Sequence, residues 1–502
     1  MSRDLRLPTL AAALTLLLHL IGNAHYGFFR DELYFIICGR HPALGYVDQP
    51  PLVPLIAAGT QLFGISLFWL RVAPALCAAA GVFTSLRLVQ QLRGGAFAQI
   101  LTAICFALAP VLVSFGEKVS TDMIGLWLWP LAALYVARLI DGADARWWLA
   151  AGAAIGVAGE AKYSVLFFAI SLIVGLAISP QRRVLVTPWF LGGVALAILI
   201  VLPNFLWQAV NGFPMMELLR NGQHGKNVVL SPAAYLIQEI LIFNPALSLI
   251  WIVGLIYAAI VARLRWIAAT MVLLMAMMIA LHAKHYYPAD AYALLFAAGA
   301  IALEAATVRA RLLRPVIAVV ALLLGAALLP VELPILPIPQ FLAYGKALNS
   351  ALHLKSKDVA TEHNRLGRLP QDYADMQGWP EMVAAVAKVY DTLPPARRAR
   401  AAIFTDNYGE AAAIDFFGGA YGLPPALSGH NQYWLWGPRG YDGSTVVKIG
   451  GDGATSVFAR SRVATRFANP WGMPYEDDLP IWLLEDPKRP LDTIWPSTKT
   501  YI

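Results

Sequence analysis

Long apolar blocks separated by short polar hinges are the feature that most constrains this chain of 502 residues. Of its residues 58% are hydrophobic and only 14% are charged, whereas soluble globular proteins carry about 25% charged residues. A membrane span needs an apolar helix that crosses about 30 Å of hydrocarbon. The sequence therefore predicts a polytopic α-helical membrane protein with about 11 transmembrane helices. They are expected at 7–21, 72–88, 97–115, 123–139, 147–157, 165–178, 184–206, 245–261, 266–281, 289–303 and 316–329.

The basic residues predict how these spans are oriented. The first block could be taken for a signal peptide, but many spans follow it, so we expect an uncleaved first helix. Cytoplasmic loops are enriched in Lys and Arg. That rule places the N-terminus in the cytoplasm, and an odd number of spans places the C-terminus outside. The basic residues of the inside loops are then Arg3, Arg6, Arg87, Arg93, Arg138, Arg146, Arg182, Arg183, Arg263, Arg265, Arg309, Arg311 and Arg314.

The texture of the chain changes after Pro330, where prolines mark a linker and charged residues return. We expect a transmembrane domain over 1–335, with interfacial helices in its first outer loop, and a soluble extracytoplasmic domain over 340–502. The second domain mixes a helical pattern at 381–390 with strand-like runs at 402–404 and 445–449, which predicts a small α/β domain.

Several classes of function are disfavoured. The net charge of +7 comes from residues at helix ends, which does not indicate nucleic-acid binding. Cys38, Cys77 and Cys105 are too few and too scattered for a disulfide framework or a zinc site. The chain has no phosphate-binding Walker loop, dinucleotide fingerprint, zinc-protease motif or nucleophile elbow. This pattern disfavours a cytoplasmic ATP-driven or nucleotide-sugar enzyme.

Two polar groups lie in the predicted first outer loop. Asp31 and Glu32 are adjacent carboxylates next to Arg30, suited to a general base or a metal ligand. They would equally suit the first turn of a short interfacial helix at 32–38. Asp48 and Gln49 precede two prolines and could bind sugar hydroxyls. Alternatively, Asp48 caps a second interfacial helix.

Two further groups follow in later outer loops. Lys118 and Asp122 precede the fourth span, where Asp122 would be a second acid or an ordinary first-turn carboxylate. Lys162 with Tyr163, and Lys284 with His285 and Tyr286, would supply positive charge for a lipid phosphate. The alternative for these is snorkelling and interfacial aromatic side chains. Charges near a membrane core are costly and usually functional, so we expect the acids and cations to converge.

These motifs resemble a known family. Arg30-Asp31-Glu32, followed by the string Gly-Tyr-Val-Asp-Gln-Pro-Pro-Leu at 45–52, is similar to bacterial members of glycosyltransferase family 39. These are related to the protein O-mannosyltransferases and to the aminoarabinose transferase of lipid A, which share the membrane C-type glycosyltransferase fold. Further matches are Ser120-Thr121-Asp122, Lys162-Tyr163, Pro203-Asn204 and His285-Tyr286-Tyr287-Pro288.

The outer domain contains two stretches, at 406–412 and 429–437, that are similar to segments of uncharacterised family members. His430 belongs to the second stretch, whose aromatic and amide side chains could bind a sugar. The alternative is a buried strand with structural tryptophans.

The resemblance implies an enzyme of the bacterial inner membrane. It would move a monosaccharide from a polyprenyl-phosphate donor to a hydroxyl of lipid A, a cell-wall glycan, another lipid or a protein, with inversion. It implies Asp31 as the general base and Lys162 or Lys284 as phosphate ligands. Glu32 and Asp122 would position the acceptor or orient a cation. Some members of the fold bind a divalent cation such as Mg²⁺ or Mn²⁺ and others do not; if this chain binds one, Asp31 and Asp122 would hold it.

Two other classes of protein fit parts of the pattern. A transporter or flippase for a lipid-linked sugar would suit the many helices, but it should place charge at the bilayer midplane between inverted repeats. A receptor or scaffold would bind glycan through the outer domain without catalysis. Charges at the outer rim and the lack of a repeat favour the enzyme.

Overall fold

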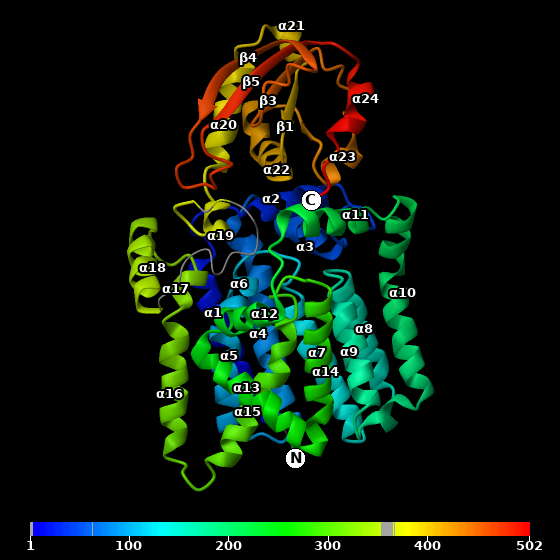
Figure 1. Cartoon of the computed structure of the whole chain (residues 1–502), viewed down its shortest axis with the longest axis vertical. Coiled ribbons are helices and arrows are strands. Elements are labelled where there is room, and N and C mark those ends of the chain that lie inside the picture. Colours follow the sequence, from blue (N-terminus) through cyan, green and yellow to red (C-terminus); the bar gives the residue numbers. More distant parts are fainter. Residues whose placement is uncertain (1–3, 63, 353–364, 366) are drawn as a thin grey trace. The chain divides into compact units, whose positions relative to one another are not determined.

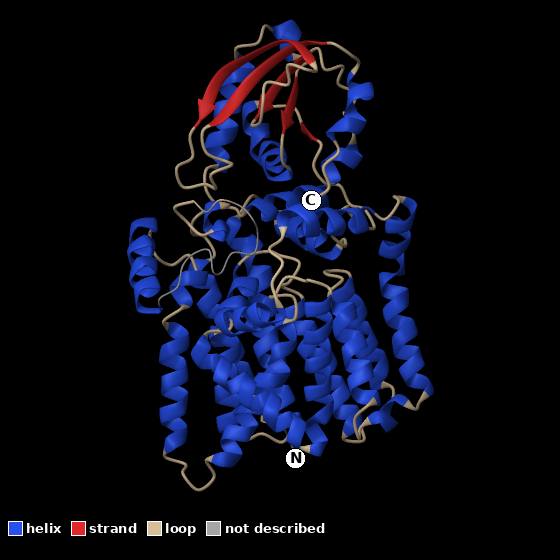
Figure 2. Ribbon diagram, in the orientation of Figure 1, coloured by secondary structure: helices blue, strands red, loops and turns tan. Residues whose placement is uncertain are grey.

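The structure is a computed structural model that describes residues 4–62, 64–352, 365 and 367–502. It is mostly helical, and its strands all lie in the C-terminal part of the chain (Figure 2). Two compact units share the chain. Unit 1 comprises Met1–His25, Phe68–Trp207 and Val228–His353, and unit 2 comprises Tyr26–Leu67, Gln208–Asn227 and Leu354–Ile502. Each unit is described by itself.

Unit 1 is a bundle of helices (Figure 1). Most of them are apolar along their whole length, as the blocks of the sequence require. They are α1 (Arg6–Gly22), α4 (Leu67–Gln91), α5 (Ala96–Leu108), α6 (Pro110–Glu117), α7 (Gly125–Ile140), α8 (Trp147–Gly159), α9 (Val165–Ala177), α10 (Pro188–Val210), α12 (Pro232–Ile242), α13 (Pro245–Ile260), α14 (Arg265–Ala280), α15 (Tyr292–Ala306), α16 (Leu313–Ala326), α17 (Leu329–Glu332) and α18 (Ile338–Leu352).

Among the described residues, five helical stretches are long and apolar enough to cross a membrane. Two bent pairs would raise that number to seven: α5 with α6, bent by 63°, and α12 with α13, bent by 115°. Four shorter apolar helices, α1, α7, α8 and α9, do not reach that length. Proline begins α6 and α13, which accounts for the two breaks because it cannot continue the preceding helix.

Glycine allows a close helix contact in unit 1, between α13 and α15. A Cβ on Gly254 would lie 2.0 Å from the carbonyl oxygen of Leu295, and one on Gly299 would lie 1.9 Å from that of Ile250. Small residues let membrane helices approach in this way. By contrast, only 11% of the apolar window of α10 or α16 is buried by protein. Such exposed apolar faces suit a lipid environment.

Unit 2 combines short helices with one sheet. Its first helices, α2 (Arg30–Arg40) and α3 (Leu52–Thr60), come from the predicted first outer loop and pack against each other. Its other helices are α11 (Pro214–Asn221), α19 (Gln371–Ala374), α20 (Trp379–Asp391), α21 (Pro395–Arg398), α22 (Tyr408–Phe417), α23 (Gln432–Trp436) and α24 (Leu491–Ile494).

The sheet has five strands in the order β2-β1-β3-β5-β4. Strand β1 (Ala402–Thr405) pairs in parallel with β2 (Ala426–Ser428) and with β3 (Thr445–Ile449). Strand β5 (Leu479–Pro487) pairs antiparallel with β3 and with β4 (Phe458–Phe467). Buried side chains of the strands form the core with residues of the C-terminal segment: Ala402, Leu427, Val446, Phe458, Leu484, Leu491 and Trp495.

The extent of unit 2 differs from the predicted soluble segment 340–502. It also takes in Tyr26–Leu67 and Gln208–Asn227. The physical reason is packing: α2 contacts α22 as well as α3, so the first loop forms part of the same compact unit as the sheet.

Candidate active site

The acidic pair Asp31 and Glu32 lies in the first turn of α2. Phe29 precedes the helix in an extended conformation, and its backbone N–H donates to the Glu32 carboxylate at 2.8 Å. Glu32 is fully buried. A carboxylate in the first turn that accepts from the backbone satisfies a free N–H, and its negative charge interacts favourably with the positive end of the helix dipole. The geometry therefore favours a structural part for Glu32 and leaves Asp31 as the accessible acid.

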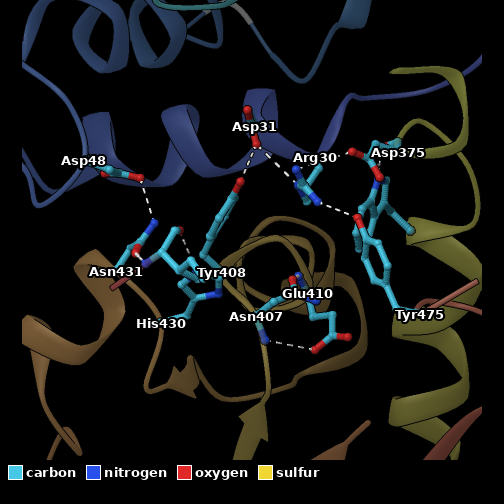
Figure 3. A network of polar contacts seen from close by, with 12 residues as sticks. Arg30, Asp31, Asp48, Asp375, Asn407, Tyr408, Glu410, His430, Asn431 and Tyr475 are labelled. Carbon is cyan, nitrogen blue, oxygen red and sulfur yellow. Dashed lines mark hydrogen bonds and ion pairs between the residues drawn. The ribbon is translucent and has the colours of Figure 1, made fainter. Parts of the chain in front are cut away.

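Asp31 is held through one of its two oxygens (Figure 3). The Tyr408 hydroxyl donates to its Oδ1 at 2.7 Å, and Arg30 Nε lies 3.4 Å from the same atom. Among the described residues, none makes a hydrogen bond or ion pair to Oδ2. The side chain is 33% exposed. Asp31 thus presents one carboxylate oxygen that a substrate proton can reach.

Arg30 links this carboxylate to the C-terminal part of unit 2. Its Nη1 donates to the Tyr475 hydroxyl at 2.9 Å, and its Nη2 lies 3.4 Å from Asp375 Oδ2. Asp375 is buried, and so is Glu476 beside it in the same network. Burial and the charge of Asp375 raise the pKa of Glu476 well above its usual range. A neutral Glu476 leaves Arg30 balanced by Asp375 and Asp31.

Asp48 lies in the same loop as Asp31 but has both oxygens occupied. Tyr34 donates to Oδ1 at 3.0 Å and Asn431 donates to Oδ2 at 3.1 Å. Burial raises the pKa of Asp48 to about 6. Its neighbour Gln49 is buried. The alternative interpretation of Asp48 as a cap receives no support from the hydrogen bonds of α3, because its side chain joins Tyr34 and Asn431 instead.

One partner of each acid follows the carboxyl end of a parallel strand. Tyr408 begins α22, three residues after the end of β1, and Asn431 follows β2 by the same spacing, next to His430. Ligand-contacting loops in α/β folds emerge at this edge of the sheet. The His430 ring lies 4.8 Å from the Tyr408 ring, and its Nε2 is 3.3 Å from the Ile502 carbonyl oxygen. His430 thus packs beside the Asp31 network.

Unit 1 contains the second predicted constellation. Asp122, in the turn between α6 and α7, pairs with Lys162, which follows α8, at 2.5 Å. The Lys162 ammonium also lies 4.2 Å from the Tyr287 ring centre and 5.3 Å from that of Tyr286. Although burial favours the neutral form, the charge of Asp122 raises the pKa of Lys162. This lysine therefore keeps its positive charge.

The other predicted cations of unit 1 differ in character. Lys284 lies 6.0 Å from the Tyr286 ring centre, and Lys118 donates to Ser114 Oγ at 2.8 Å. Burial lowers the pKa of His285 to about 4, so this histidine is neutral at pH 7. Tyr163 donates its hydroxyl to Asn204. Positive charge for a phosphate would thus come from the lysines.

Sequence reasoning missed several buried charged residues of unit 1. Asp290 is buried where a Cβ on Gly125 would lie 1.9 Å from its Oδ2, and Arg71 pairs with Glu117 at 3.2 Å with both side chains buried. Asp290 sits in an apolar block as an isolated acid, and that costly placement was the available signal. Tyr408 and Asn431 lie in the two stretches noted at 406–412 and 429–437, but nothing in those stretches indicated a contact with Asp31 or Asp48.

The predicted site residues fall into two sets. Unit 2 holds Asp31, Glu32, Asp48, Gln49 and His430, and unit 1 holds Lys118, Asp122, Lys162, Tyr163, Lys284, His285 and Tyr286. Asp31 and Asp122, the predicted metal ligands, belong to different units. Within the part of the chain that the structure describes, no three His, Cys, Asp or Glu side chains gather as a metal site.

Comparisons with known proteins give relatives over part of the sequence. Residues 48–207 match a family described as dolichyl-phosphate-mannose-protein mannosyltransferase. The lipid A galacturonosyltransferase RgtD of Rhizobium johnstonii is 28% identical over 182 residues, which cover 36% of this chain and 38% of that protein. The chain therefore aligns with little more than a third of the length of this curated relative.

Solved structures are similar over nearly the whole chain. ArnT from Cupriavidus metallidurans, in its crystal structure bound to undecaprenyl phosphate, has a TM-score of 0.60 and 14% identity, with 94% of this chain and 97% of that chain covered. The arabinofuranosyltransferase AftD from Mycobacteria has a TM-score of 0.50 and 14% identity, with 97% and 40% covered. These likenesses concern the fold. The resemblance seen in the sequence is thus confirmed: this chain has the membrane C-type glycosyltransferase fold, and residues 48–207 match the mannosyltransferase family.

Proposed function

We propose that this protein is an inverting glycosyltransferase that moves a monosaccharide from a polyprenyl-phosphate donor to an extracytoplasmic hydroxyl. The open Oδ2 of Asp31, on a carboxylate fixed through its other oxygen, is the observation that carries the proposal. The fold shared with ArnT bound to undecaprenyl phosphate supports the donor. The match to a lipid A galacturonosyltransferase supports an envelope lipid or glycan as acceptor.

We propose that the protein crosses the bacterial inner membrane eleven times. The five long helical stretches, the two bent pairs and the four shorter apolar helices make eleven elements, and they fall on the eleven predicted segments. The basic inside loops then place the N-terminus in the cytoplasm. In this topology 1–335 is the transmembrane catalytic domain and 340–502 lies on the periplasmic side.

In the reaction, the acceptor hydroxyl oxygen attacks the anomeric carbon of the sugar. The bond from that carbon to the phosphate oxygen breaks, and the polyprenyl phosphate leaves with the electron pair. Asp31 Oδ2 takes the hydroxyl proton. A positioned base of this kind contributes about 10² to 10⁴ in rate. One displacement at the anomeric carbon inverts its configuration.

The lysines of unit 1 are the proposed phosphate ligands. Lys162 is charged and partly exposed, at 19% of its side chain, and Lys284 follows in a separate loop. Fixed positive charge stabilises the leaving phosphate as it develops. We assign Asp122 to orienting Lys162, and Lys118, Tyr163, His285 and Tyr286 to the surroundings of the donor. We propose that Asp48, Gln49 and His430 form the surroundings of Asp31. We derive no step through a divalent cation, because the described acids do not gather as a metal site.

The proposal is tested with the full chain reconstituted in lipid nanodiscs. It would be supplied with a panel of undecaprenyl-phosphate monosaccharides that includes galacturonic acid, with lipid A and other envelope acceptors. We expect transfer of one of these sugars, and loss of transfer in Asp31→Asn with retained binding of undecaprenyl phosphate. Parental turnover in Asp31→Asn would show that Asp31 is not the base. Translocation of the donor in proteoliposomes without any transfer would favour the transporter.

A further inference from the structure

Tyr408 makes the shortest contact to Asp31, from a position 377 residues later in the chain. Its hydroxyl lies 2.7 Å from Asp31 Oδ1, whereas Arg30 Nε approaches the same oxygen only to 3.4 Å. Hydrogen bonds to ionised groups are shorter and about twice as strong as neutral ones. The Tyr408 contact is therefore the main restraint on this carboxylate.

The backbone of Tyr408 is fixed by the start of α22. Asn407 caps the helix by accepting from the N–H of Glu410 at 2.9 Å, and the buried Glu410 carboxylate accepts from the N–H of Asn407 at 3.3 Å. Gly409 lies so close to α2 that a Cβ would stand 2.3 Å from Arg30 Cγ. The first turn of α22 is thus held both by its cap and by contact with α2.

The Tyr408 ring is enclosed as well. It lies 4.6 Å from the Tyr34 ring and 4.8 Å from the His430 ring, and the Arg30 guanidinium carbon stands 5.5 Å from its centre. Only 8% of the residue is exposed. A ring confined on these sides cannot swing away, so its hydroxyl reaches Asp31 Oδ1 in one orientation (Figure 3).

We infer that Tyr408 is a positioning residue for the reaction: it fixes Asp31 through Oδ1 so that Oδ2 faces the acceptor hydroxyl. The inference rests on the proposed function. It makes the C-terminal domain a contributor to catalysis, although Tyr408 itself touches no substrate. Holding a base in its reactive geometry lowers the barrier without a change in donor affinity.

The test compares Tyr408→Phe with a matched control, Tyr390→Phe. Tyr390 is also a buried tyrosine of unit 2, and its hydroxyl donates to the Arg398 carbonyl oxygen at 2.8 Å. Loss of the Tyr408 hydroxyl should lower kcat by about ten- to a hundredfold, the factor expected for one hydrogen bond to a charged group. The KM for the undecaprenyl-phosphate sugar should stay within twofold of its parental value. Tyr390→Phe should keep parental kcat.

The double variant separates positioning from general damage. In Asp31→Asn the reactive carboxylate is already lost, so adding Tyr408→Phe should lower kcat less than twofold further. Multiplied losses in the double variant would overturn the inference, as would parental kcat in Tyr408→Phe. If Asp31→Asn itself kept parental turnover, Asp31 would not be the base. That result would overturn the proposed function, whereas the two results above would overturn only the role of Tyr408.

A second measurement does not depend on activity. The melting temperatures of the parent, Asp31→Ala, Tyr408→Phe and the variant that carries both changes form a cycle in which the Tyr408–Asp31 contact appears as a coupling. We expect the double variant to melt clearly above the temperature given by adding the two single shifts. Additive shifts would overturn the inference even if no sugar of the panel were transferred.

Discussion

Asp31 and Asp48 lie seventeen residues apart in the same loop, and both bind residues that follow strands of the sheet. They nevertheless differ in one respect. Asp48 has a donor on each oxygen, from Tyr34 and Asn431, whereas both contacts of Asp31 fall on Oδ1. Both oxygens of Asp48 accept a hydrogen bond, whereas Oδ2 of Asp31 has no donor among the described residues. Hydrogen-bond geometry therefore distinguishes a structural acid from a reactive one where composition cannot.

Asp122 of unit 1 is a third case. Its Oδ1 pairs with Lys162 at 2.5 Å, so its charge serves to hold a lysine. In the proposed function each acid has a different role: Asp31 would accept the proton, Asp122 would orient Lys162, and Asp48 would join Tyr34 to Asn431.

The largest effect is expected at the first turn of α2. Asp31→Asn removes the base and should lower turnover by about 10³, within the range for general-base catalysis. Glu32→Gln still offers an oxygen to the N–H of Phe29 and should lose less than tenfold. Turnover of both variants in nanodiscs is the measurement. Equal losses would mean that Glu32 shares the catalytic role that the sequence predicted for it.

A somewhat smaller effect is expected at Lys162. Lys162→Gln removes the charge that Asp122 holds, and it should lower kcat/KM for the donor by about a hundredfold, as for loss of one group that stabilises a leaving oxyanion. Arg263→Gln is the matched control, because it breaks another ion pair of unit 1, with Asp141 at 2.7 Å. If both variants lost activity alike, ion-pair loss alone would explain the Lys162 result.

Substitution of Asp48 should lower stability more than substitution of Asp31, the opposite of the order expected for turnover. Asp48→Ala leaves the Tyr34 hydroxyl and the Asn431 amide without their acceptor and should cost about 1–3 kcal/mol of unfolding free energy. Asp31→Ala should cost less, because its side chain is 33% exposed and water can replace it. Denaturant or thermal unfolding of the detergent-solubilised chain would measure this. A larger cost for Asp31→Ala would contradict the comparison.

The smallest effect is a dependence of stability on pH. Burial raises the pKa of Asp48 to about 6, and burial with the nearby charge of Asp406 raises that of Glu410 to about 8. The folded chain thus keeps protons that the unfolded chain releases from about pH 4 upward, so unfolding free energy falls as pH rises from about 4 to 8. The melting temperature should be lower at pH 8 than at pH 5.

Glu410→Gln, which stays neutral, provides the check on this slope. Its melting temperature should fall less between pH 5 and 8 than that of the parent. An unchanged slope would show that Glu410 does not carry the effect.

Local signals in the sequence predicted much of the fold. The apolar blocks and the acidic start of α2 coincide with observed elements, as do strands β1 and β3, whereas the break at Pro110 within the predicted span 97–115 was not expected. Strand β4 was missed because its arginines point outward in a pattern of mostly exposed residues, which an apolar criterion does not detect.

The contacts that define the site were not predictable in the same way. Tyr408 reaches Asp31 across 377 residues, and Asn431 reaches Asp48 across 383. Such pairings depend on how the sheet and α2 pack together, and no local pattern records that packing. Sequence reasoning could therefore identify Asp31 and Asp48 as candidate residues but could not tell that only one has an open oxygen.

The most direct test of the account is the ratio of turnover numbers of Asp31→Asn and Asp48→Asn, measured side by side on the same donor and acceptor. Both variants exchange one carboxylate for an amide in the same loop. If Asp31 is the base, Asp48→Asn keeps at least a hundredfold more activity than Asp31→Asn, in line with the rate that a positioned base supplies. A ratio near one, with both variants folded, would contradict it.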